Sequence, residues 1–117
     1  MTGEEARQYA RVVTWQSPGF EIVGGQTVTS ATTLSSDSGR LIQLDASGAP
    51  FTLTLPASPY TGMTFILSEI AGSVNLVTVD GNGKSINGGP SLSMNGAYRQ
   101  RWVRYNGTQW IVIGGLL

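Results

Sequence analysis

The feature that most constrains the fold of this chain is a pair of strand-like runs near its C-terminus, joined by Asn106-Gly107. Asn-Gly readily places both central residues of a type I′ turn at positive φ, and that turn closes tight β-hairpins. The sequence therefore predicts a hairpin within Tyr98–Gly114. Its return arm is apolar on both faces, with Trp110 and Val112 on one and Ile111 and Ile113 on the other. Both faces of such a strand are expected to be buried. One packs on the core of the domain, and the other packs on a second surface, for example another copy of the chain.

The remaining sequence predicts more short strands. The 117 residues correspond to one domain, and they include 16 glycines, 24 serines and threonines, and only 14 charged residues. Further β-prone runs are separated by turn signals at intervals of about 8–12 residues, which predicts a compact antiparallel β-sandwich or barrel-like domain of the jelly-roll type. These runs are Arg40–Asp45, Phe51–Leu55, Met63–Ser68, Val74–Val79, Lys84–Asn87 and Ser91–Met94.

Residues 1–31 are predicted to form an extended N-terminal arm, and residues 32–117 the β-domain. Within the arm, Arg11–Trp15 is strand-like and is stopped by Ser17-Pro18-Gly19. Two short β-prone runs, Phe20–Val23 and Gln26–Ser30, are split by two glycines and predict a second hairpin.

Charge and composition exclude several classes of function. Seven acidic and seven basic side chains cancel, so no long-range field attracts nucleic acid or an anionic membrane. The absence of cysteine and histidine removes thiol nucleophiles, imidazole bases and nearly all zinc chemistry. No secretory signal and no apolar run of about 18 residues is present, so we expect a chain made and folded in a cytoplasm.

The candidate catalytic and metal residues are better explained as turn residues. Asp37, Asp45, Glu69 and Asp80 are scattered, and each lies beside a turn-forming residue. The run from Asp80 to Lys84 imitates the start of a calcium loop but lacks the glutamate that completes one. We therefore expect no enzymatic activity, no cofactor and no metal.

The aromatic and arginine residues of the closing hairpin leave two interpretations open. Tyr98, Trp102, Tyr105 and Trp110 favour core or subunit interface over a sugar-binding platform. Arg99, Arg101 and Arg104 favour solvent-facing or paired charges over a phosphate or carboxylate contact.

An ordered series of motifs resembles a known module. Together they are similar to the small β-domain of tailed-bacteriophage virion proteins, which include head decoration (cement) proteins, head fibres and tail fibres. The match covers about residues 32 to 114, and it departs from the pattern at Asn106, where aspartate is usual, and in its arginine-rich strand. The motifs are Ser36-Asp37-Ser38-Gly39-Arg40-Leu41-Ile42, Phe51-Thr52-Leu53-Thr54-Leu55-Pro56, Gly62-Met63-Thr64-Phe65, Asn75-Leu76-Val77-Thr78-Val79, Ile86-Asn87-Gly88 and Asn106-Gly107-Thr108-Gln109-Trp110.

The resemblance implies a non-enzymatic structural protein that works as a homotrimer on the virion surface and assembles in the host bacterial cytoplasm. A module with only a short arm fits a capsid decoration protein that binds the major capsid protein and stabilises the shell. The alternative is a head-fibre or tail-fibre domain that binds host glycan. The residues expected to contact the capsid are Tyr9, Arg11, Val13, Trp15 and Phe20, and those expected at the trimer interface are Met63, Trp102, Trp110 and Ile113.

Overall fold

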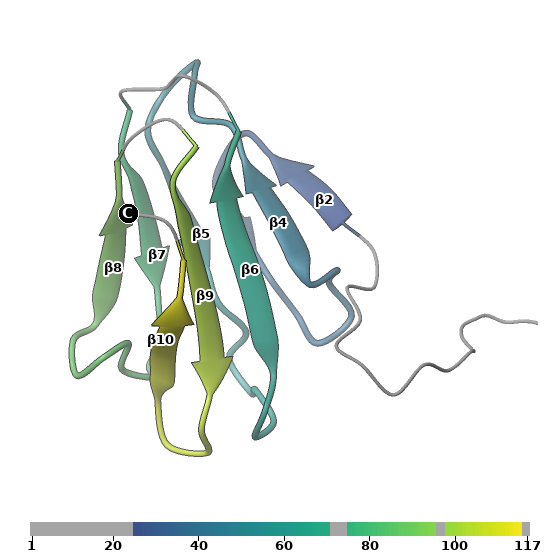
Figure 1. Cartoon of the computed structure of the whole chain (residues 1–117), viewed down its shortest axis with the longest axis vertical. Coiled ribbons are helices and arrows are strands. Elements are labelled where there is room, and N and C mark those ends of the chain that lie inside the picture. Colours follow the sequence, from purple (N-terminus) through teal and green to yellow (C-terminus); the bar gives the residue numbers. More distant parts are fainter. Residues whose placement is uncertain (1–24, 71–74, 96–97, 116–117) are drawn as a thin grey trace, which may run out of the picture.

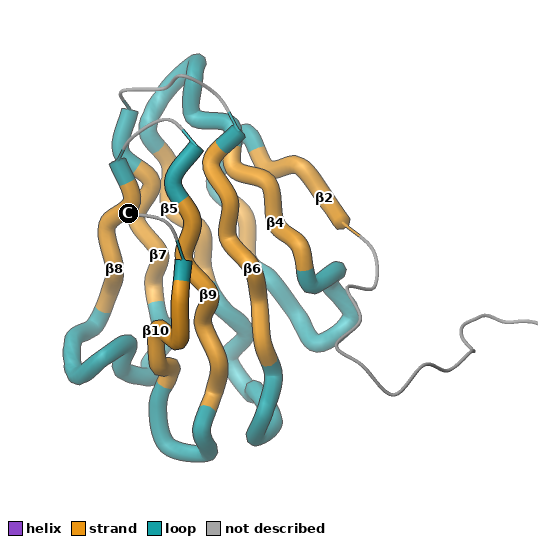
Figure 2. Tube along the Cα trace, viewed as in Figure 1, coloured by secondary structure: helices purple, strands orange, loops and turns teal. Residues whose placement is uncertain are grey.

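The computed structural model describes residues 25–70, 75–95 and 98–115, and within these ranges the chain forms strands, turns and loops without a helix. Figure 1 shows the strands arranged in two sheets, and Figure 2 shows the loops that join them. The five-stranded sheet has the order β10-β9-β6-β4-β2, and the four-stranded sheet has the order β3-β5-β7-β8. The prediction of an all-β fold is confirmed. The strands are β2 (Gly25–Val28), β3 (Thr32–Thr33), β4 (Leu41–Leu44), β5 (Phe51–Thr54), β6 (Thr64–Glu69), β7 (Val77–Asp80), β8 (Ser91–Met94), β9 (Gln100–Tyr105) and β10 (Trp110–Gly114).

From β2 to β7 the chain alternates between the two sheets and winds into three stacked coils. The coils are β2–β3, β4–β5 and β6–β7, and each strand pairs in parallel with the corresponding strand of the next coil. A parallel pair needs a long crossover between its strands. Here the crossover that leads from β2 to β4 contains β3 of the opposite sheet, so each sheet supplies the connections of the other.

The predicted antiparallel, jelly-roll-type arrangement is therefore wrong in strand direction. Of the seven strand pairs in the described residues, four are parallel, and only β6–β9, β9–β10 and β7–β8 are antiparallel. In an antiparallel arrangement, many turn residues would join neighbouring strands of one sheet. Most of them instead carry the chain from one sheet to the other, as residues 45–50 do between β4 and β5.

One hydrophobic core lies between the two sheets. Alternate residues of the strands face it, so that β4 buries Ile42 and Leu44 while Leu41 and Gln43 are only half-buried. In β7 the same period buries Val77 and Val79. This alternation is the one predicted from the sequence, because successive side chains of a strand point to opposite faces.

Type I′ turns are present, but they form at Asn82-Gly83 and Asn87-Gly88 and not at the predicted Asn106-Gly107. Asn82 and Gly83 have φ values of 55° and 89°, and Asn87 and Gly88 have values of 48° and 85°. Both pairs close turns, because Lys84 N donates to Gly81 O at 3.1 Å and Gly89 N donates to Ile86 O at 3.0 Å. Positive φ at both central residues with this hydrogen bond defines a type I′ turn.

Asn106-Gly107 closes the predicted hairpin with a longer loop. Trp110 pairs with Tyr105, so residues 106–109 connect the strands, and Asn106 is not among the residues at positive φ. The Asn106 side chain instead accepts hydrogen bonds from the backbone N–H groups of Thr108 and Gln109, both at 2.9 Å. The hairpin is confirmed, and the turn type is corrected.

The predicted N-terminal arm, residues 1–31, contains a strand of the observed fold. Strand β2 lies inside residues 1–31 and pairs in parallel with β4, and its Val28 is buried in the core. The second run of the predicted Phe20–Val23 and Gln26–Ser30 hairpin is therefore a sheet strand, while the first run lies outside the described residues. Lys84–Asn87 is not a strand, because only Ile86 forms bridges there, with Gly89 and Trp110.

Candidate functional site

The outer face of the five-stranded sheet carries an apolar row. On the inner face, Ile42, Phe65, Leu67 and Val103 belong to the core. The alternate residues point outward, and the strand register joins Leu41 to Ile66, Ile66 to Trp102 and Trp102 to Gly114. We call Leu41, Ile66, Trp102 and Gly114 the outer row.

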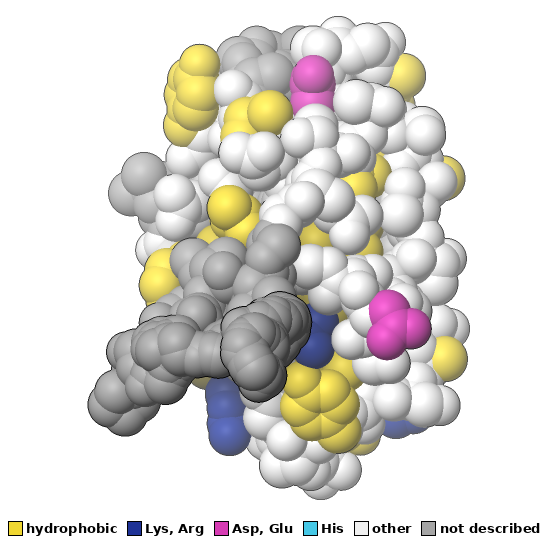
Figure 3. Space-filling model, turned by 90° about the vertical axis from the view of Figure 1, so that its right-hand side faces the viewer, with side chains coloured by type: hydrophobic (Ala, Val, Ile, Leu, Met, Phe, Trp, Pro, Cys, Tyr) yellow, Lys and Arg dark blue, Asp and Glu magenta, His cyan; other side chains and the backbone are white. Residues whose placement is uncertain are grey.

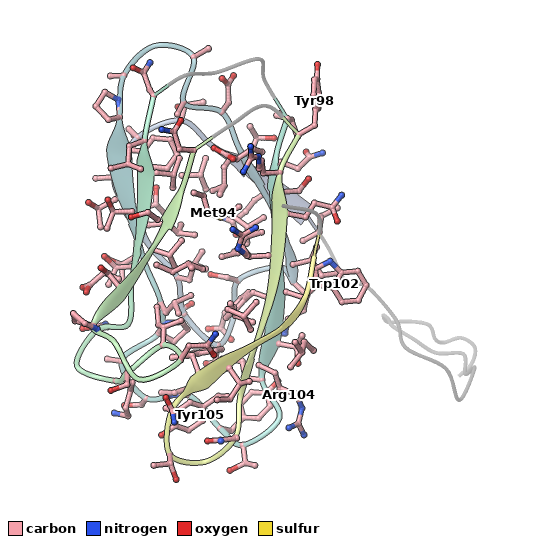
Figure 4. The ribbon with its side chains drawn as sticks, turned by 60° about the vertical axis from the view of Figure 1, so that its left-hand side comes forward. Met94, Tyr98, Trp102, Arg104 and Tyr105 are labelled. Atoms are coloured by element: carbon pink, nitrogen blue, oxygen red, sulfur yellow. The ribbon has the colours of Figure 1, made fainter. Side chains whose placement is uncertain are left out.

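Ile66 shows that the outer row is packed apart from the core. Its side chain is only 5% exposed, yet it does not belong to the core cluster. Leu41 and Trp102, its neighbours in register on β4 and β9, are half-buried. Figure 4 shows Trp102 projecting outward from the ribbon. The sheet thus has a second apolar layer on the side that faces away from the core.

Mostly polar residues border the outer row on both sides, and the apolar exception is Ile111, which pairs with Arg104. The neighbouring row contains Thr27, Gln43, Ser68 and Gln100, and Thr27 Oγ1 donates to Gln43 Oε1 at 3.2 Å. On the other side Thr64 lies opposite Arg104, which is exposed and also points outward in Figure 4. An apolar patch with a polar rim is the usual anatomy of a protein contact surface.

Strand β10 adds to this surface through side chains on its outer face. Its edge adds nothing, because the backbone groups there are already hydrogen-bonded. Trp110 N donates to Ser85 O at 2.8 Å, Asn87 N to Trp110 O at 2.9 Å, and Val112 N to Asn87 Oδ1 at 3.0 Å. These bonds occupy the edge of the strand that faces away from β9. Ile113, the extra residue of a bulge between Val112 and Gly114, is 52% exposed.

The residues predicted for a trimer interface divide into two groups. Met63 and Trp110 are 0% exposed in the single chain, so they belong to the core and cannot contact a partner directly. Trp110 lies between Tyr105 and Phe65, with ring centroids 5.4 Å and 5.9 Å away. Ile113 is exposed and Trp102 is half-buried on the outer face, and sequence reasoning missed Leu41 and Ile66. Both were visible as apolar residues of predicted strands, but which strands are neighbours was not.

The aromatic residues do not form a common platform. Tyr105 and Trp110 are buried in the core, whereas Tyr98 is 63% exposed and Trp102 lies on the outer row. The three arginines are also divided. Arg101 pairs with the inward-facing Leu67, and Arg104 points outward. The charges therefore do not form one continuous patch.

The acidic residues do not converge either. The described part of the chain contains no group of three or more carboxylates that would suit a metal ion. In the calcium-like run, Asn82 Nδ2 donates to Leu55 O at 3.0 Å and Lys84 Nζ donates to Ala57 O at 3.3 Å. Both side chains thus hold the turn against the loop that follows β5. Glu69 is the one charged residue with a buried side chain in the described ranges, at 2% exposure.

Asp45 stabilises the turn after β4. Its Oδ1 accepts a hydrogen bond from the backbone N–H of Ser47 at 3.0 Å. Hydrogen bonds from the Ser47 side chain and then from the Ser47 backbone lower the pKa of Asp45 below its ordinary value. This is the turn role predicted for the residue.

The residues predicted for capsid contact, namely Tyr9, Arg11, Val13, Trp15 and Phe20, lie outside the described residues. In the described part of the chain, no helix is long and apolar enough to cross a bilayer.

The sequence matches none of the models of known protein families. A search of curated proteins finds no related sequence.

Proposed function

We propose that this chain is a structural virion protein of a tailed bacteriophage, and specifically a homotrimeric capsid decoration protein that stabilises the shell. The outer row is the observation that carries the proposal. Leu41 and Trp102 are half-buried and Ile113 is exposed on this face, and a self-associating protein buries such side chains further. The ordered sequence motifs supply the bacteriophage context.

The composition supports the same class of function. With 14 charged residues in 117, the surface is dominated by uncharged polar groups, which suits close contact with other subunits because few charges must lose their water. Figure 3 shows this for the side of the molecule on which β2 lies, where charged side chains are few. A decoration protein needs contact surfaces, and the outer row provides one of them.

The experiment that tests the proposal is sedimentation of the purified protein, alone and mixed with undecorated phage heads. The expected result is a trimer that sediments with the heads and saturates at a fixed stoichiometry. A trimer that does not bind heads, but binds glycans on an array in a manner abolished by Trp102→Ala, would establish the fibre alternative. A monomer in solution that also fails to bind heads would contradict both.

A pair of matched variants tests the surface itself. Ile113→Arg places a charge beside the outer row, and Leu76→Arg places one on an apolar side chain that is 39% exposed ahead of β7 in the four-stranded sheet. We expect Ile113→Arg to sediment as a folded monomer and Leu76→Arg to remain a trimer. If both variants remain trimers, the outer row is not the interface.

A further inference from the structure

A short turn at one end of the sandwich presents an exposed tyrosine. Tyr60 lies in the connection between β5 and β6, and its side chain is 53% exposed. Met63 N donates to Tyr60 O at 3.0 Å, and Gly62, the third residue of this turn, has a φ of 95°. Gly62 N also donates to Tyr105 O at 2.7 Å, so the turn is fixed to β9. We call residues 60–63 the Tyr60 turn.

Arg40 fixes the outer end of the tyrosine side chain. Its Nη2 donates to the Tyr60 hydroxyl at 2.9 Å. The guanidinium is itself held, because its Nη1 donates to Ser38 O at 2.8 Å and its Cζ lies 5.2 Å from the centre of the Phe65 ring. Phe65 belongs to the core, so the contacts run from the core to the surface. The ring of Tyr60 is therefore oriented before any ligand binds, and such a ring loses little conformational entropy on binding.

The guanidinium of Arg104 lies against the Tyr60 turn. Its Nη2 is 3.5 Å from the position that a Cβ on Gly62 would occupy. Arg104 is exposed, and its side chain forms no hydrogen bond or ion pair with any described residue. Thr61, the second residue of the turn, is also exposed. Figure 4 shows Arg104 pointing outward at this end, and Figure 3 shows Lys and Arg side chains next to hydrophobic ones at the lower end of the molecule.

The anchoring distinguishes the Tyr60 turn from other exposed surface. At the opposite end of the ladder between β6 and β9, Tyr98 and Arg99 are also exposed, and their side chains form no hydrogen bond with a described residue. The ring of Tyr60 is exposed to a similar extent but is held by Arg40. A ligand site needs such a ring, since groups that are oriented in advance bind more tightly than mobile ones.

We propose that the Tyr60 turn is a binding site for a negatively charged sugar, which packs on the Tyr60 ring and places a carboxylate or phosphate on Arg104. An aromatic face offers apolar surface to the C–H groups of a sugar ring. A guanidinium binds a carboxylate or phosphate through two parallel hydrogen bonds. The hydroxyl of Thr61 both donates and accepts hydrogen bonds, as the hydroxyl groups of a sugar do.

The local charge supports an anionic ligand. The connections 34–40 and 55–63 contain one carboxylate, that of Asp37, and one arginine, Arg40. Arg104 adds a second arginine beside them, so the charge around the Tyr60 turn is positive although the whole chain is neutral. A neutral sugar would leave the guanidinium of Arg104 in water, whereas a charged one uses it.

This inference goes beyond the proposed structural role and does not depend on it. A protein with no affinity for phage heads can carry the sugar site, and a decoration protein can lack it. Sugar binding by the purified protein is measured without heads, so the failure of either proposal leaves the other standing.

Titration of the full chain with three small sugars, followed by NMR, tests the site. Glucuronic acid carries a carboxylate, glucose 6-phosphate carries a phosphate, and glucose carries neither. We expect the amide signals of Thr61 and Gly62 to shift, and at least one charged sugar to bind at least about tenfold more tightly than glucose, because charge-assisted hydrogen bonds are the stronger ones. The tighter of the two charged sugars identifies the source of the charge. Unshifted signals at these residues, or equal affinities for all three sugars, would overturn the proposal.

Matched variants assign the binding to the two side chains. Arg104→Gln should weaken the binding of the charged sugar at least about tenfold and leave that of glucose unchanged. Tyr60→Ala should weaken the binding of all three sugars. The controls are Tyr98→Ala and Arg99→Gln, which change an exposed tyrosine and an exposed arginine at the opposite end and should leave every affinity unchanged. A Tm close to that of the unmodified chain shows that each variant is folded. Equal losses in the test and control variants would overturn the proposal.

Discussion

Asn87 Oδ1 accepts a hydrogen bond from the backbone N–H of Val112 at 3.0 Å, across 25 residues of sequence. The bond fixes the loop after β7 to the edge of β10. Asn87 is suited to this position for a second reason, because its φ of 48° is one that asparagine adopts more readily than most residues.

Two substitutions at Asn87 separate these roles. Asn87→Gly keeps the backbone conformation and removes the hydrogen bond, so we expect a loss of about 0.5–1.5 kcal/mol in the free energy of unfolding. Asn87→Ala adds the cost of positive φ for a residue with a Cβ, and we expect about 1 kcal/mol more. Urea unfolding followed by tryptophan fluorescence measures both. Equal losses would show that the backbone conformation does not matter here.

Gly81 is required for steric reasons. A Cβ at this position would lie 1.9 Å from the carbonyl oxygen of Lys84, which belongs to the turn backbone and cannot rotate away. We expect Gly81→Ala to lower the free energy of unfolding by about 1–3 kcal/mol, the usual cost of overpacking. Gly48→Ala is the matched control, because no atom lies within 4 Å of the Cβ it would add. A similar loss in both variants would contradict the steric explanation.

The Asn106 loop depends on an acceptor and not on positive φ. Asn106→Asp keeps the oxygen that accepts from Thr108 and Gln109, so we expect thermal stability equal to or above that of the unmodified chain. Asn106→Ala removes both bonds, and we expect a loss of about 1 kcal/mol. Thermal unfolding followed by circular dichroism compares the two. Destabilisation by Asn106→Asp would show that the amide nitrogen contributes as well.

Among the described residues, Trp110 is the largest side chain that is fully buried. We expect Trp110→Ala to cost about 3–5 kcal/mol, as other deletions of large aromatic side chains from cores do. Trp110→Phe should cost much less, because a ring remains between Tyr105 and Phe65 and the substitution removes Nε1, a buried donor without a partner among the described residues. Denaturant unfolding of both variants gives the comparison. Equal costs would contradict this account of the site.

Asp45 should affect how the stability of the folded protein changes at acid pH. Its pKa is lowered in the folded protein, so its contribution is present above the ordinary value of 3.8 and is lost as the pH falls through the lower, folded value. Ser47→Ala removes the largest cause of the shift, and we expect the pKa of Asp45 to move back toward 3.8. Carboxyl titration by NMR measures this directly. An unchanged pKa would assign the whole effect to the backbone bond.

The sequence predicts the strands well and their partners poorly. Ser91–Met94 was predicted with its observed bounds, and Phe51–Leu55 with an error of one residue. The alternation that predicts a strand is a local property, since it depends only on which face of that strand is buried. Pairing is different: Leu41 lies beside Ile66, and no local pattern states that these residues are neighbours.

The same difference between local alternation and strand pairing explains which residues of the candidate surface the sequence predicts. The sequence predicts Trp102 and Ile113 at a trimer interface, and the structure places Trp102 on the outer row and Ile113 at a bulge of β10 beside it. Met63 and Trp110 are predicted at the same interface, but both side chains are buried in the core of the single chain. A single strand shows which residues share a face, but only the packing of the two sheets decides which face is inside.

By itself, the sequence determined that the chain is all-β, where most of its strands lie and how their side chains alternate, because short-range sterics and burial fix these properties. Only the tertiary structure decided that the coils are parallel and that the outer row forms. It also decided which Asn-Gly pairs adopt the type I′ turn. These properties depend on contacts between segments far apart in the chain, such as Asn87 with Val112 and Ile66 with Trp102. Their energies are set by packing, which local sequence does not encode.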